Sequence, residues 1–118
     1  MQVIFLLEKT KRLTFLYDYY GNLLTDKQQQ IMKLYFFQDF SLAEIAKKLD
    51  ISRQGVYDHL QRAEKVLNEY EAKLELVKKY KEIKEELESF ALDIDQIISD
   101  NNKKEKLQQR LDSLKQKI

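Results

Sequence analysis

Side chains that can pair with nucleic-acid bases and phosphates recur along residues 53–62. Gln can pair bidentately with adenine, Arg can pair with guanine or phosphate, and a Tyr hydroxyl can donate to phosphate. At 3.6 residues per turn, a helix here presents Gln54, Tyr57, Asp58, Gln61 and Lys65 on one side, with Arg53 and Arg62 on the flanks. The opposite side carries Val56 and Leu60, so the stretch predicts an amphipathic helix with a base-reading surface.

The preceding residues have the spacing of a helix-turn-helix, in which a short helix, a tight turn and a second helix pack closely together. Ser41 and Glu44 form a capping-box pattern at the start of the first helix. Asp50 stands in the turn, where a residue that tolerates positive φ is needed. Ser52 can cap the second helix. Residues 41–62 therefore predict a helix-turn-helix, although two capped helices of an ordinary bundle would share these features.

The predicted contacts with duplex DNA divide between the two helices. We expect Arg53, Gln54, Tyr57, Gln61 and Arg62 to enter a major groove, and Ser41, Lys47 and Lys48 to reach phosphates. Residues 25–62 contain six basic and five acidic side chains, a net charge of +1. Asp58, at the centre of the predicted face, repels phosphate unless it accepts from a cytosine amino group. We therefore expect DNA binding to be weak and sensitive to salt.

Three sequence stretches together carry a family resemblance. They are LLTDKQ at 23–28, SLAEIAKKLDISRQGVYD at 41–58 and RAEKVLNEYEAKL at 62–74. Over roughly residues 8–98 the chain resembles the YlxM family of small bacterial proteins, and its helix-turn-helix with the upstream LT-x-x-Q resembles region 4 of sigma-70 type factors. The resemblance implies a DNA-binding protein with a regulatory or accessory role in the signal recognition particle pathway. The alternative is an accessory factor that uses the motif as a scaffold for protein binding, and touches the targeting GTPase or its RNA.

Two features depart from the sigma pattern. Sigma recognition helices usually follow their central Val with basic residues, whereas here Val56 precedes Tyr57, Asp58 and His59. The chain also lacks a counterpart of sigma region 2, so the resemblance does not extend to promoter melting. We expect His59, beside the buried stripe, to pack or to contact phosphate.

Composition limits the remaining functions. The chain has 118 residues, no Pro, two Gly, no Cys and one His, which predicts an all-α protein without disulfides or a zinc site of ordinary composition. No phosphate loop, nucleophile motif or metal-ligand spacing is present, so we expect no enzymatic activity, no metal and no cofactor. The apolar run at residues 3–7 is too short to cross a membrane. We expect a cytoplasmic protein without membrane insertion, in which this run packs as the start of the first helix.

Helix signals divide the chain into an N-terminal domain, 1–66, and a C-terminal helical arm, 67–118. We expect a first helix over 3–20, ended by Gly21-Asn22 as a C-terminal cap. A second helix over 25–38 opens with a Thr25/Gln28 capping box and turns Ile31, Leu34, Tyr35 and Phe36 inward. The tyrosines and phenylalanines between Tyr17 and Phe40 are expected to form core, with hydroxyls at its rim.

Apolar heptad spacing continues after Arg62 and predicts one helix over 52–98. Such a helix would be about 70 Å long, so we expect a bend at 78–81, where the heptad register shifts, or a partner chain. A break at 99–102 precedes a last helix. The arm predicts homodimerisation, because a two-fold operator needs two copies of the motif. The alternative is an intramolecular bundle.

Overall fold

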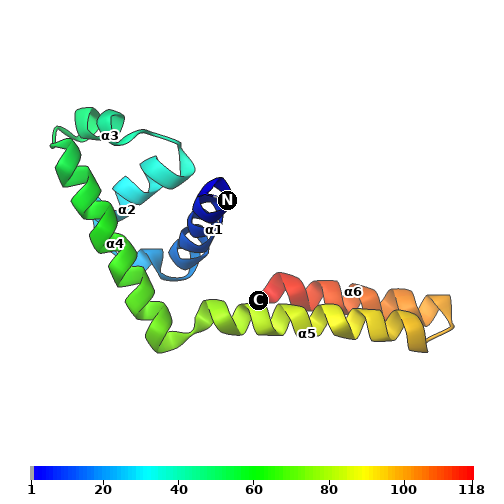
Figure 1. Ribbon diagram of the computed structural model, residues 1–118. Helices are drawn as coiled ribbons and strands as arrows, with labels where there is room; N and C mark the ends of the chain where they lie inside the picture. Colours follow the sequence, from blue (N-terminus) through cyan, green and yellow to red (C-terminus); the bar gives the residue numbers. More distant parts are fainter. Residues whose placement is uncertain (1) are drawn as a thin grey trace. The chain divides into compact units, whose positions relative to one another are not determined.

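The computed structural model describes the backbone of residues 2–118 and the side chains of residues 7–118 (Figure 1). The chain forms two compact units, residues 1–75 and 76–118. The first contains α1 (Gln2–Tyr20), η1 (Gly21–Leu23), α2 (Asp26–Met32), η2 (Lys33–Phe37), α3 (Leu42–Leu49) and α4 (Arg53–Leu74). The second contains α5 (Leu76–Ile97) and α6 (Asn101–Lys117). No strand occurs over residues 2–118, which confirms the predicted all-α class.

Helix α4 is the element on which the first unit is built. Helices α1, α2 and α3 each pack against it. Its apolar stripe of Val56, Leu60, Ala63 and Leu67 is buried, as predicted. Leu16, Ile31 and Ile45 are also completely buried, and one comes from each helix that packs against α4. The core of the unit therefore lies along one face of α4.

The end of α1 corrects the predicted role of Gly21. Gly21 does not adopt positive φ, and the chain continues into the 3₁₀ turn η1 instead of a left-handed cap. A Cβ atom at this position would lie 3.0 Å from the Tyr17 ring, tighter than most side-chain contacts, so the ring would have to shift. Glycine lets the aromatic ring lie close against the backbone at this position.

The predicted single helix over 25–38 is interrupted. Thr25 and Gln28 form the expected capping box, but the α-helical pattern ends at Met32 and a π-helical segment, η2, follows. The Gln38 N–H donates to the Lys33 carbonyl at 3.0 Å, five residues back. The aromatic residues Tyr35, Phe36 and Phe37 lie within this wider turn, which shifts them from the positions that α-helical periodicity predicts. Leu34 remains buried, but Tyr35 is exposed, so its predicted inward position is wrong.

The predicted aromatic core is only partly present. Tyr20 is buried and Tyr17 is half-buried, as expected for core, whereas Tyr19 and Phe37 are exposed. At the start of α1, Leu7 is 65% exposed, which contradicts the expected packing of the apolar run at that residue. The side chains of residues 3–6 in this run lie outside the described residues. None of the described helices combines the length and apolar character that a bilayer span requires.

Helix α4 ends at Leu74, so the helix predicted over 52–98, with a bend expected at 78–81, is interrupted before that bend. Glu75 adopts a left-handed conformation with φ 55°, and its N–H donates to the Glu71 carbonyl at 2.9 Å. This C-terminal cap stands before the predicted bend at 78–81 and coincides with the division between the two units. The boundary expected after residue 66 falls inside α4.

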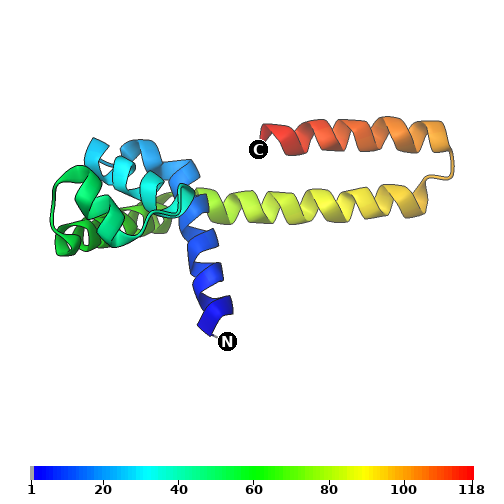
Figure 2. The ribbon, with the colours of Figure 1, turned by 90° about the horizontal axis from the view of Figure 1, so that it is seen from above.

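Helices α5 and α6 form an antiparallel hairpin (Figures 1 and 2). Asp100, in the predicted break, caps α6 by accepting from the Asn102 N–H at 2.9 Å. Ile94, near the end of α5, and Leu111, in α6, are both buried. Lys104 and Asp95 form an ion pair at 3.7 Å.

A buried polar contact ties α1 to the distal half of α4 and yields a stability prediction. The Tyr20 hydroxyl donates to Glu71 Oε1 at 2.6 Å, and Glu71 is only 9% exposed. We expect Tyr20→Phe to lower the free energy of unfolding by about 1–3 kcal/mol, because a hydrogen bond to a buried carboxylate is lost. Urea denaturation measures this change. Tyr35→Phe, at an exposed site, is the control and should unfold like wild type; equal stability of the two variants would contradict the prediction.

Candidate nucleic-acid interface

The turn between α3 and α4 has the predicted backbone geometry. Asp50 adopts φ 55° and ψ 47°, and its N–H donates to the Ala46 carbonyl. Asp tolerates this left-handed region better than most non-glycine residues. The turn directs the chain from α3 into α4 within three residues, Asp50 to Ser52.

Serine side chains cap both helices of the motif. The Glu44 N–H donates to Ser41 Oγ at 3.0 Å, and the Ser41 N–H donates to Glu44 Oε1 at 3.1 Å. The Gly55 N–H donates to Ser52 Oγ at 2.9 Å. These bonds satisfy backbone groups that a helix start leaves without a partner. Both predicted caps are confirmed.

The Glu44 carboxylate is held in its charged form by the capping box. The Ser41 backbone N–H, and to a lesser extent the Ser41 hydroxyl, lower the pKa of Glu44 from its ordinary value of 4.5. Hydrogen bonds donated to a carboxylate favour the ionised state. The contribution of this capping box to the stability of α3 therefore depends on pH.

Buried residues join the two helices into one motif. Ile45 of α3 and Val56 of α4 are both completely buried. Leu49 and Ile51, on either side of Asp50, are half-buried. Helices α3 and α4 are thus held at a fixed crossing by their apolar faces, which leaves the polar sides of both helices turned outward.

All of the side chains predicted to contact DNA are exposed. Arg53, Gln54, Tyr57, Gln61 and Arg62 lie on the first half of α4, and Ser41, Lys47 and Lys48 lie at the start and in the last turn of α3. We call the five residues on α4 the reading face. The structure keeps them free of the core; which of them touches DNA stays a prediction.

Two contacts organise side chains at this surface. Gln54 Nε2 donates to Asp58 Oδ1 at 3.0 Å, one helical turn further on. This bond uses one of the two amide hydrogens of Gln54 and leaves the other, with the carbonyl oxygen, for a base. Lys48 Nζ lies 5.2 Å from the centre of the Phe40 ring, a cation–π contact that restrains its ammonium group.

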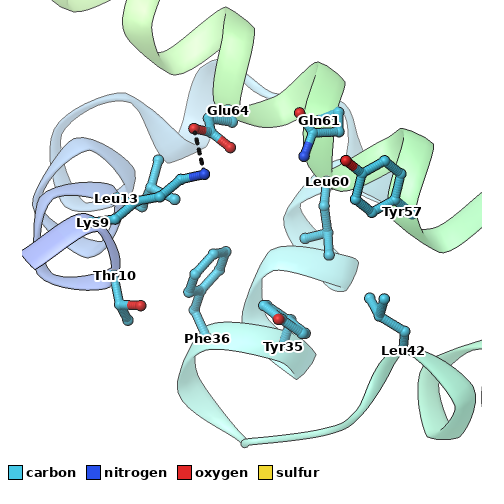
Figure 3. A pocket seen from close by; sticks show the side chains of 10 residues that line it. All are labelled: Lys9, Thr10, Leu13, Tyr35, Phe36, Leu42, Tyr57, Leu60, Gln61 and Glu64. Carbon is cyan, nitrogen blue, oxygen red and sulfur yellow. Dashed lines mark ion pairs between the residues drawn. The ribbon is translucent and has the colours of Figure 1, made fainter. Parts of the chain in front are cut away.

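A hollow of about 330 Å³ lies beside the reading face, and the sequence did not predict it (Figure 3). Tyr57 and Gln61 of the reading face form part of its wall. Tyr35 and Phe36 point into it from η2 (Figure 3). Ordinary α-helical periodicity predicts that these two rings enter the core. They line the hollow instead because they lie in the π-helical turn. An aromatic pair at the end of a helix is the only signal in the sequence.

Other chemistry finds little support at this surface. His59 is half-buried on α4, consistent with its expected place beside the apolar stripe. Within the part of the chain that the structure describes, no group of three or more His, Asp or Glu side chains is arranged to hold a metal ion.

The fold and the exposed polar face define the class of helix-turn-helix proteins. A family profile described as "Putative helix-turn-helix protein, YlxM / p13 like" matches residues 7–114, and the chain belongs to this family, UPF0122. The UPF0122 protein YlxM of Bacillus subtilis is 53% identical over 79 residues, which are 67% of this chain and 72% of the relative. A UPF0122 protein of Bacillus pumilus is 44% identical over 108 residues, 92% of this chain and 94% of the relative. A relative from Caldanaerobacter subterraneus is 58% identical over 76 residues, 64% of this chain and 65% of the relative.

The capping box predicts a pH-dependent contribution to stability. A depressed pKa in the folded state stabilises the fold above the unfolded-state pKa, and this contribution is lost as pH falls through the folded-state pKa. We therefore expect Glu44→Gln to lower the melting temperature at neutral pH, and the difference from wild type to shrink towards about pH 3. Melting curves followed by circular dichroism test this. The exposed Glu105→Gln on α6 serves as control; a difference for Glu44→Gln that does not change with pH would contradict the prediction.

Proposed function

We propose that this protein is a non-enzymatic regulator that binds double-stranded DNA through its helix-turn-helix, in a sigma-70 region 4-like manner. The exposure of the whole reading face on a rigidly packed and capped α4 is the observation that carries the proposal. Gln54, Arg53 and Gln61 bring the hydrogen-bonding groups that pair with base edges. Ser41, Lys47 and Lys48 bring donors for phosphates. A role on DNA places the protein with the chromosome in the cytoplasm.

Charge limits the affinity of this interface. Duplex affinity depends largely on cations that replace counterions at the phosphates. Asp58 is exposed at the centre of the reading face and opposes this attraction, although its bond from Gln54 directs one carboxylate oxygen towards the amide. Specificity in this proposal therefore comes from base contacts, and electrostatic attraction contributes little.

Binding to a pool of random-sequence duplexes, with sequencing of the retained fraction, tests the proposal. We expect wild type to enrich a two-fold symmetric site. On that site Arg53→Ala with Gln54→Ala should weaken binding about tenfold or more, since each bidentate base contact contributes roughly 1–3 kcal/mol. Asp58→Asn should instead tighten binding a few-fold, because it removes a charge that repels phosphate.

The control for Asp58→Asn is Asp95→Asn, which removes an exposed carboxylate from α5, outside the motif. It should bind like wild type, and circular dichroism should show equal helicity in all variants. Absence of an enriched site, or unchanged binding by the double variant, would overturn DNA reading by this face.

We further propose that the protein acts as a homodimer through α5. Leu76, Ile83, Phe90 and Ile97 recur at intervals of seven residues and are 39%, 46%, 54% and 79% exposed. We call these four residues the heptad row. Apolar side chains at a strict seven-residue interval stay on one side of a helix and are typical of a coiled-coil seam. Pairing of two such rows would bury apolar surface that the α5–α6 hairpin leaves in water, and would supply two copies of the motif.

Light scattering after gel filtration tests the dimer. Wild type is expected to have the mass of two chains, and Ile83→Ser with Phe90→Ser the mass of one, because two large apolar side chains leave the seam. Leu92→Ser changes a 65% exposed leucine outside the heptad row and should remain dimeric. A monomeric wild type, or a dimeric double variant, would contradict pairing through this row.

A protein-binding accessory role in the signal recognition particle pathway is the second candidate. The modest charge of the motif and the exposed carboxylate of Asp58 favour it. Binding to a protein does not require the motif to be strongly basic, whereas tight binding to DNA phosphates does. This candidate predicts co-purification with the particle from a DNase-treated lysate, together with no enrichment from the duplex pool. The link to the pathway comes from the family resemblance and is a proposal here.

A further inference from the structure

The hollow beside the reading face has the size and lining of a small-molecule site. Its volume of about 330 Å³ falls at the lower end of the range for ligand pockets, about 300–1,000 Å³. Residues of α1, η2, the start of α3 and α4 form its wall (Figure 3). Leu13, Phe36 and Leu60 contribute apolar surface, which suits a ring or another compact apolar group.

Opposite charges lie next to each other on the same wall. Lys9 Nζ is 3.4 Å from Glu64 Oε1, and both side chains line the hollow (Figure 3). Their side chains are 49% and 25% exposed, so a ligand can reach the pair. A partly exposed ion pair contributes little to stability, so opening it costs little free energy.

This combination selects a chemical class. We propose that the hollow binds a free aromatic amino acid, whose carboxylate pairs with Lys9, whose ammonium pairs with Glu64, and whose ring packs among Leu13, Phe36 and Leu60. A ligand with one charge that separates the ion pair leaves either Lys9 or Glu64 without a partner, whereas a zwitterion can pair with both. Phe36 and Tyr35 can meet the ring edge to face, an arrangement that aromatic pairs favour. Thr10 and Gln61 add polar groups that can fix the orientation of the ligand.

Binding in the hollow would affect DNA reading, and this step rests on the proposed function. Tyr57 and Gln61 belong both to the reading face and to the wall of the hollow. A ligand that contacts them changes the conformations they can adopt at a major groove. Because coupling between two sites is reciprocal, DNA that favours one arrangement of these side chains also changes the affinity for the amino acid.

Titration of the DNA-free protein, followed by isothermal calorimetry and by amide chemical shifts, tests the site. The probes are L-phenylalanine, L-tyrosine and L-tryptophan. Phenethylamine lacks the carboxylate, 3-phenylpropionate lacks the amine and L-alanine lacks the ring. We expect at least one aromatic amino acid to bind and shift amides around the hollow. Each of these three analogues, which lack one group, should bind about tenfold more weakly or worse. Absence of binding by every aromatic amino acid up to about 10 mM, or equally tight binding of the three analogues, would overturn the site.

Matched variants locate the site on the chain. Lys9→Met and Glu64→Gln should each weaken amino-acid binding about tenfold or more, since each removes one charged partner. Lys104→Met with Asp95→Asn removes a comparable ion pair from the α5–α6 hairpin and should bind like wild type. Both Lys9 and Glu64 are outside the core, so melting curves should show folded variants. Unchanged binding by the Lys9 and Glu64 variants would overturn the assignment.

The ligand experiment and the DNA experiment fail independently. Amino-acid titration contains no DNA, so a negative duplex result leaves a bound ligand in the hollow unaffected. Duplex retention is then measured with and without a saturating amino acid. A change in affinity of about threefold or more supports the coupling, and an unchanged affinity overturns the coupling while the site stands.

Discussion

The first unit depends on the burial of one apolar stripe along α4. Val56, Leu60, Ala63 and Leu67 give α1, α2 and α3 a common surface against which to pack. When one face of a helix is buried in the core, the rotation of the helix about its axis is fixed, and its polar face is turned to solvent. The reading face is therefore positioned by the core: the residues that bury α4 also determine which of its side chains point outward.

Local backbone features turn this core into a motif with defined edges. Positive φ at Asp50 joins α3 to α4, and positive φ at Glu75 ends α4 where the first unit ends. At the distal half of α4, the buried bond between Tyr20 and Glu71 adds a polar tie to α1. The motif and the hairpin of α5 and α6 are thus separate units of one chain. This division suits a protein in which one unit reads a partner and the other assembles copies, as we propose.

The same packing creates the hollow. Helix α1 and the segment η2 approach α4 from different directions, and their side chains do not fill the space between Leu13, Phe36 and Leu60. Because Tyr57 and Gln61 serve both the hollow and the reading face, the core, the proposed ligand and the proposed DNA contacts meet on one helix. Regulation through this site would require only a rearrangement of side chains on α4.

The sequence alone determined the features that depend on neighbouring residues: the all-α class, both serine caps of the motif, the Asp50 turn, the buried stripe of α4 and the exposure of its polar face. Each follows from a hydrogen bond or an apolar spacing within a few residues, so a local pattern contains the information. Tertiary structure decided the rest. The π-helical turn at Lys33–Phe37, the close approach of the Tyr17 ring to Gly21 and the end of α4 at Leu74 depend on how segments pack together or on where a helix cap forms. The heptad spacing continued past Glu75, and the periodicity of side chains cannot reveal a single left-handed residue that ends the helix.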